Sequence, residues 1–251
     1  MSFIFPSLSP RGLMAAAAAI LLLGPSMTEV GLAACGDNVN GERVACRCGD
    51  SVVADTHLEA QDPVVRERCG GDGLFIRAPK GAATITLDLG GLSLIGSGIG
   101  TGIRVISGGS EGAVIIGGRP GDVAEIVGFG TGVDAHGSHR LKELRGLIVK
   151  GNKRDGVNVY GSPGALIQNV TSTKNGRDGL RIRSRGARVR SVEASDNAKA
   201  GIRVSGETAT VQAQVQGNHK EGVVARGRGH DLSGIELGDG QKADVLVRPS
   251  K

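Results

Sequence analysis

Three pairs of polar residues recur at a spacing that could build a site for sugar acids. One residue of each pair lies two positions, and the other four positions, after a glycine: Asp134 and His136, Asn158 and Tyr160, Arg181 and Arg183. Elimination or C5 epimerisation of a uronate needs a cation or an amide to neutralise the carboxylate. It also needs a base for the C5 proton and an acid for the other face or the leaving oxygen. We predict His136, Tyr160 and Arg181 for these roles.

In that hypothesis Asp134, Asn158 and Arg183 bind the substrate, and Asn158 could replace Arg181 in neutralising the carboxylate. The alternative is a solvated strand face on which Asp134 and the arginines form weak ion pairs. No cluster of acidic residues resembles a Ca²⁺ site, and no close Asp pair resembles a glycosidase. The other histidines fall at unrelated positions of the repeat. We therefore expect neither a metal ion nor a cofactor.

A second set of cations precedes the glycines. Arg154, Arg177, Lys199, Lys220 and Lys242 each lie two residues before the start of the next repeat, and Arg203 and Arg226 continue the outward positions of the strands. One interpretation is a turn whose charges form ion pairs and protect sheet edges. The other is a row of cations that binds a linear polyanion. The expected partner is an acidic polysaccharide rather than nucleic acid, because aromatic residues for base stacking are almost absent.

These residues can meet only if the chain forms a stack of short parallel strands. Segments of the form glycine, apolar, any, apolar begin at Gly102, Gly132, Gly156, Gly179, Gly201 and Gly222, in steps of 30, 24, 23, 22 and 21 residues. Alternation of apolar and polar residues is the period of a strand with one buried face. Four asparagines, Asn152, Asn175, Asn197 and Asn218, each lie four residues before the next glycine. Stacked repeats would align their amides in a hydrogen-bonded ladder along the axis.

The repeat resembles that of the right-handed parallel β-helix family with the pectin-lyase-like fold, from about residue 72 to the C-terminus. The resemblance implies an all-β, right-handed parallel β-helix, here of about seven to eight coils. In members that act on polysaccharides it also implies a substrate groove on the face that carries the polar pairs. Asp134-Ala135-His136 is similar to the Asp-Pro-His motif of mannuronan C5-epimerases. Ala135 departs from that motif, and Gly161 stands near the place of the family's arginine, so Arg181 would have to replace it.

The N-terminus predicts export. Residues 1–34 contain a basic residue, an apolar run and a zone of small residues, as in a secretory signal peptide. An uncleaved anchor is an alternative, although the apolar run is short for a membrane span. Leu32-Ala33-Ala34-Cys35 also resembles a bacterial lipobox, which would make Cys35 a lipidated first residue. We expect a secreted or periplasmic protein without a transmembrane segment.

The cysteines, Cys35, Cys46, Cys48 and Cys69, all lie shortly after this signal. An even number in an exported protein predicts two disulfides, in which Cys46 and Cys48 each join Cys35 or Cys69. A zinc site of four thiolates is the alternative. We predict a disulfide-containing cap at 35–73, similar to the caps of secreted bacterial members, and the β-helix at 74–251.

Three functions of different classes fit these features. The leading hypothesis is an exported protein that binds acidic polysaccharide or another polyanion without cleaving it, because the cations are numerous and the catalytic set departs from its family pattern. The second is a uronate lyase or C5-epimerase that uses His136, Tyr160 and Arg181. The third is a structural surface or adhesive module, in which the charges only solvate the strands.

Overall fold

The computed structural model describes residues 34–39, 41–77, 84–106, 112–119, 121–136, 141–241 and 243–248. Residues 1–33 of the predicted signal peptide and Lys242 of the second cation set lie outside these ranges. One short helix, α1 (Pro63–Arg66), and a small antiparallel pair, β1 (Asn38–Val39) and β2 (Glu42–Arg43), occur near the start of the described chain. The other elements described are strands of two parallel sheets.

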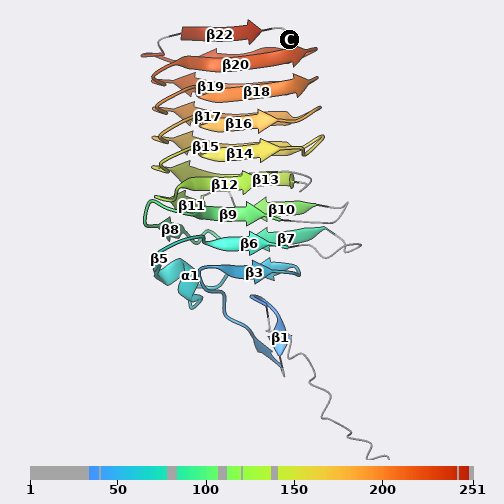
Figure 1. Ribbon diagram of the computed structural model, residues 1–251, viewed down its shortest axis with the longest axis vertical. Coiled ribbons are helices and arrows are strands. Elements are labelled where there is room, and N and C mark those ends of the chain that lie inside the picture. The colour runs from blue at the N-terminus through green and yellow to red at the C-terminus, as the bar shows by residue number, and fades with distance from the viewer. Residues whose placement is uncertain are drawn as a thin grey trace, which may run out of the picture. The chain divides into compact units, whose positions relative to one another are not determined.

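Each turn of the chain adds one strand to a nine-stranded sheet, and the strands stack one above another (Figure 1). They are β3 (Asp50–Val52), β6 (Leu74–Ile76), β9 (Thr101–Val105), β12 (Thr131–Ala135), β14 (Val157–Tyr160), β16 (Leu180–Arg183), β18 (Ile202–Glu207), β20 (Glu221–Arg228) and β22 (Ala243–Arg248). Nine strands that are one turn apart span eight turns. The predicted all-β parallel solenoid and its number of coils are therefore confirmed.

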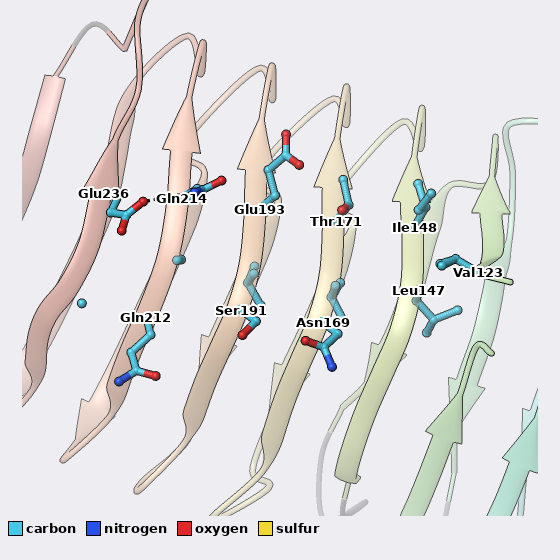
Figure 2. A pocket seen from close by; sticks show the side chains of 14 residues that line it. Val123, Leu147, Ile148, Asn169, Thr171, Ser191, Glu193, Gln212, Gln214 and Glu236 are labelled. Atoms are coloured by element: carbon cyan, nitrogen blue, oxygen red, sulfur yellow. Dashed lines mark hydrogen bonds between the residues drawn. The ribbon is translucent and has the colours of Figure 1, made fainter. Parts of the chain in front are cut away.

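The remaining strands form an eleven-stranded parallel sheet. They are β4 (Thr56–His57), β5 (Arg68–Cys69), β7 (Ile85–Asp88), β8 (Leu94–Gly96), β10 (Ala113–Ile116), β11 (Ala124–Val127), β13 (Leu141–Lys150), β15 (Leu166–Thr173), β17 (Arg188–Ser195), β19 (Thr210–Gln216) and β21 (Asp231–Leu237). Both β10 and β11 pair with the long strand β13. From β13 onward one strand per turn covers both segments. In β15 and β17 this strand bends at a residue of positive φ, Asn169 (51°) and Ser191 (48°) respectively. Figure 2 shows these bend residues in one row on the surface of the sheet.

The core is one aliphatic layer per turn. Ile103, Val133, Val157, Leu180 and Ile202 pair in register on consecutive strands, and all are fully buried. Each layer is only as thick as the spacing between neighbouring strands, roughly 4.8 Å. Branched aliphatic side chains fill such a layer, and this explains why the chain contains so few aromatic residues.

The four phased asparagines form a buried ladder at one turn of the solenoid. In the last three of them, Asn175, Asn197 and Asn218, the side-chain Oδ1 accepts hydrogen bonds from both the backbone N–H and the Nδ2 of the asparagine one turn earlier, at 3.0 to 3.1 Å. The ladder begins at the N–H of Phe129, which Asn152 accepts. It ends at Gln241, whose Oε1 accepts from Asn218. Backbone groups at this turn are thereby paired without a strand.

The leading glycines lie directly against this ladder, which gives them a steric role. A Cβ atom on Gly179 would lie 2.6 Å from Nδ2 of Asn197 and 2.6 Å from the carbonyl oxygen of Gly201. We expect Gly179→Ala to lower the free energy of unfolding by about 2 kcal/mol, because a packed interior accepts extra atoms only by moving its backbone. Thermal unfolding by circular dichroism measures this. Gly70→Ala is the matched control, since a Cβ there meets no atom within 4 Å, and an equal loss in both variants would contradict the steric role.

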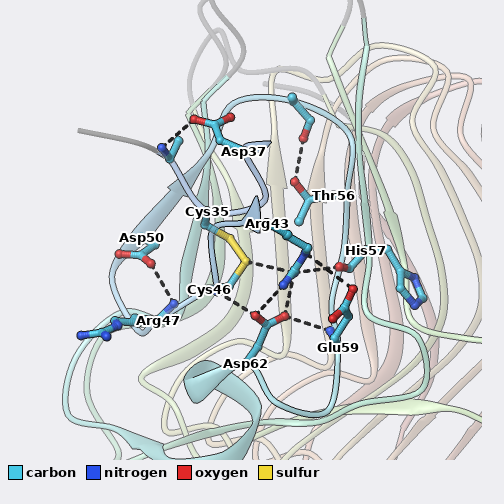
Figure 3. The surroundings of a disulfide bond; sticks show 12 residues. Cys35, Asp37, Arg43, Cys46, Arg47, Asp50, Thr56, His57, Glu59 and Asp62 are labelled. Carbon is cyan, nitrogen blue, oxygen red and sulfur yellow. Dashed lines mark hydrogen bonds and ion pairs between the residues drawn. A yellow bond between two sulfur atoms is a disulfide. The ribbon is translucent and has the colours of Figure 1, made fainter. Parts of the chain in front are cut away.

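Two disulfides lie near the start of the described chain, as predicted. Cys35 pairs with Cys46, and Cys48 pairs with Cys69. Beside the first of them Asp62 is fully buried and accepts hydrogen bonds from Arg43 and from the backbone N–H groups of Cys46 and Glu59 (Figure 3). Parallel pairing already begins at β3 with β6. The predicted cap at 35–73 thus contains the first turn of the solenoid together with both disulfides.

Candidate functional site

A cleft of about 350 Å³ opens on the nine-stranded sheet over β12, β14 and β16. Its lining residues are Thr131, Asp134, His136, Arg154, Asp155, Asn158, Tyr160, Arg177, Arg181 and Arg183, and we call it the cationic cleft. It brings together all six residues of the polar pairs with two cations of the second set. The repeat causes this, because residues one turn apart become neighbours across the sheet.

Strand register positions the polar pairs. Asn158 lies between Asp134 and Arg181 on adjacent strands, and its Nδ2 donates to Oδ1 of Asp134 at 2.7 Å. Tyr160 lies beside Arg183. The rings of His136 and Tyr160 stack with their centroids 5.0 Å apart and their planes at 22°. The two rings therefore occupy one side of the cleft as a single aromatic surface.

Arg181 and Arg203, each two residues after a leading glycine, both face the aspartate that precedes the glycine one turn earlier. Arg203 binds Asp178 through two hydrogen bonds, with Nε at 2.8 Å and Nη2 at 3.2 Å. The equivalent pair of Arg181 and Asp155 is open: Nη1 lies 3.7 Å from Oδ2, and the buried Nε of Arg181 has no hydrogen-bond partner in the described part of the chain. An arginine and an aspartate are thus hydrogen-bonded to each other in one turn, whereas the equivalent pair at the cleft is not.

Asp155 is a buried carboxyl group in the wall of the cleft. It is 6% exposed, and its Oδ1 accepts the backbone N–H of Asp178 at 3.1 Å. Burial raises the pKa of Asp155 above its usual value. The charge of Asp178 raises the pKa further, while that backbone hydrogen bond and the charges of Arg181 and Arg177 act in the opposite direction. A carboxyl group with a raised pKa can exchange protons closer to neutral pH than an exposed one.

Several residues predicted as ligands lie elsewhere. The guanidinium of Arg203 is held by Asp178, and Arg203 does not line the cleft. Lys199, Lys220 and Arg226 are exposed on later turns, outside the cleft lining. Sequence reasoning did not include Asp155 among the candidates. Its signal was the Asp-Gly dipeptide at the start of the repeat, which also occurs at Asp178.

A second groove lies along the bend of the eleven-stranded sheet, with a volume of about 620 Å³. Ile148, Thr171, Glu193, Gln214 and Glu236 pair in register along it and form a row of labelled side chains in Figure 2. No arginine or lysine is among its described lining residues. It contains none of the predicted site residues, and its chemistry does not favour an anionic ligand.

The described residues contain no group of three or more His, Cys, Asp or Glu side chains placed to hold a metal ion. Among the helices that the structure describes, none is long and apolar enough to cross a membrane.

Comparison with known proteins identifies the family. Residues 93–236, more than half of the chain, match the family described as the right-handed β-helix region. No curated protein and no solved structure matched the chain. The match covers the strands that carry the cationic cleft and most of the parallel solenoid on which they lie, so the chain belongs to the right-handed β-helix family.

Proposed function

We propose that the cationic cleft binds the carboxylate groups of an acidic polysaccharide, in an exported protein. The open pair of Arg181 and Asp155 carries this proposal. One turn later the equivalent pair of Arg203 and Asp178 is hydrogen-bonded, so this sheet can bind an arginine with its own aspartate. At the cleft Asp155 does not form such a hydrogen bond with Arg181. A ligand carboxylate would provide the second acceptor that Arg181 lacks.

The surroundings of Arg181 support an anionic ligand. Arg183, Arg154 and Arg177 line the same cleft and are exposed, while Asn158 adds an amide on the adjacent strand. Several cations around one cleft attract an anionic chain more than isolated charges do. The two disulfides favour an oxidising compartment, in which extracellular polysaccharides are found.

Binding of oligogalacturonate tests the proposal. We expect the double variant Arg181→Gln, Arg183→Gln to raise the Kd at least about tenfold, because each lost charged hydrogen bond contributes roughly 1.5–3 kcal/mol. Arg188→Gln with Arg190→Gln is the matched control: it removes the same charge from exposed positions of β17, on the other sheet. Calorimetry at fixed salt concentration measures both. Equal weakening in the two double variants would indicate general charge attraction and would contradict a site in the cleft.

A uronate lyase or C5-epimerase is the second candidate. The stacked rings of His136 and Tyr160 support it, since both rings line the same cleft as Arg181. Pectate and alginate are the substrates to test, with ultraviolet absorbance for an unsaturated product and solvent hydrogen exchange for epimerisation at C5. A signal that disappears in His136→Asn would favour the enzyme. Binding without either signal would favour the non-catalytic function, and absence of binding would leave the structural or adhesive module.

A further inference from the structure

We infer that Asp155 is the specificity-determining carboxyl group of the cationic cleft: it faces Arg181 when the cleft is empty, and it takes up one proton from solvent when a ligand carboxylate binds that arginine. This inference rests on the proposed function, because it requires an anionic ligand. Beyond that function, the inference predicts that binding is coupled to the uptake of one proton and that the cleft prefers some anions over others.

The geometry places Asp155 in competition with the ligand. Its Oδ2 faces Arg181 at 3.7 Å, which is too long for a hydrogen bond, whereas Asp178 holds Arg203 at 2.8 Å. Asp155 therefore contributes a charge near Arg181 without occupying its donors. A ligand that engages those donors would bring a second carboxylate beside Asp155.

The charges around Asp155 determine which carboxyl group becomes protonated. They are Asp178 on the next turn, Arg181 on β16, Arg203 on β18, Arg177 and Arg154 in the turns before the glycines, and Asp134, His136, Tyr160 and Arg183 in the rest of the cleft lining. Two carboxylates that share a buried site cannot both remain ionised easily, so one takes up a proton. Asp155 is the group expected to do so, because burial in the wall of the cleft already favours its neutral form.

The neutral carboxyl would then be a hydrogen-bond donor in the cleft. An O–H group of Asp155 that donates to a carboxylate oxygen forms a short, charge-assisted hydrogen bond. A sulfate ester is a much weaker base and gains less from such a donor. The cleft is therefore expected to prefer uronate carboxylates over sulfate esters of equal charge.

Calorimetry with oligogalacturonate tests the proton. Titrations at about pH 6, where uronate carboxylates are ionised, are repeated in two buffers of different ionisation enthalpy. We expect the wild-type protein to take up a proton on binding and to bind more weakly as the pH rises. Asp155→Asn should abolish the uptake, while His136→Asn should retain it. Uptake that persists in Asp155→Asn, or disappears in His136→Asn, would overturn the inference.

Two further measurements separate this inference from the proposed function. In the ligand-free protein, Arg181→Gln should raise the pKa of Asp155, measured by NMR of its carboxyl carbon, whereas Arg104→Gln in the earlier pair with Asp72 should not. An unchanged pKa in Arg181→Gln would overturn the inference without any ligand. Replacing oligogalacturonate by a galactose oligosaccharide with one sulfate ester per sugar and the same total charge should lower the affinity in wild type, and Asp155→Asn should reduce that preference. Oligogalacturonate binding without proton uptake overturns the role of Asp155 alone, whereas absence of binding overturns the proposed function as well.

Discussion

Replacing Asn175 by alanine is expected to lower the free energy of unfolding by about 4 kcal/mol. The Oδ1 of Asn175 accepts from the backbone N–H and the Nδ2 of Asn152, and its own Nδ2 donates to Asn197 and to the carbonyl of Val149. All three asparagines are at most 1% exposed, so water cannot replace these partners. Each buried polar group left unpaired costs about 1–3 kcal/mol. In the variant the backbone N–H and Nδ2 of Asn152 lose their acceptor, and Oδ1 of Asn197 loses one of its donors.

Urea unfolding monitored by circular dichroism measures this loss. Asn169→Gly is the matched control, because Asn169 is exposed and has a positive φ of 51° that glycine adopts freely. We expect the control to change the unfolding free energy by less than about 0.5 kcal/mol. The turns contact mainly their neighbours, so Asn175→Ala should also broaden the transition as the stack divides near β15. A variant as stable as the control would show that the ladder is not important for the fold.

The fold was predictable because its signals repeat. Phased asparagines recur in four turns and phased glycines in six. Each confirms the register of the next, so an error at one position is corrected by the others. Features that occur in only a few turns were not predictable. The division into β10 and β11 ahead of β13 and the end of the ladder at Gln241 depend on particular contacts rather than on the period.

The site was predictable only in part. Register alone brings Asp134, Asn158 and Arg181 to adjacent strands, and spacing is sufficient to predict that. Spacing does not distinguish Arg181 from Arg203, because both lie two residues after a glycine and one turn after an Asp-Gly dipeptide. The side-chain geometry separates them: one arginine is held by its aspartate and the other is not. The role of Asp155 depends on its burial. The residues just before it in the sequence are polar, so the sequence pattern does not predict that Asp155 is buried.

Replacing Asp62 by alanine is the other change expected to have a large effect, a loss of about 3 kcal/mol in unfolding free energy at neutral pH. Its carboxylate is fully buried and receives both terminal nitrogens of Arg43, at 2.8 and 2.7 Å, and the N–H groups of Cys46 and Glu59. Removing one partner of a buried ion pair leaves the other charge and the backbone donors uncompensated. Arg43 remains partly exposed, with 24% of its side chain accessible, so hydration limits the loss. Asp50→Ala is the control, because that carboxylate accepts only one described hydrogen bond, from the exposed N–H of Arg47.

The pH dependence gives this prediction a second test. Burial alone would raise the pKa of Asp62, but the hydrogen bonds from Arg43, Glu59 and Cys46 outweigh it and hold the pKa below its usual value. A carboxyl group whose pKa is lower in the folded state stabilises the fold above its unfolded pKa of about 3.9. That contribution disappears as the pH falls through the lower folded value. Urea unfolding should therefore show wild type and Asp62→Ala converging only in acid. A difference that stays constant down to the acid range would mean that packing, rather than the ionised carboxylate, holds the first turn.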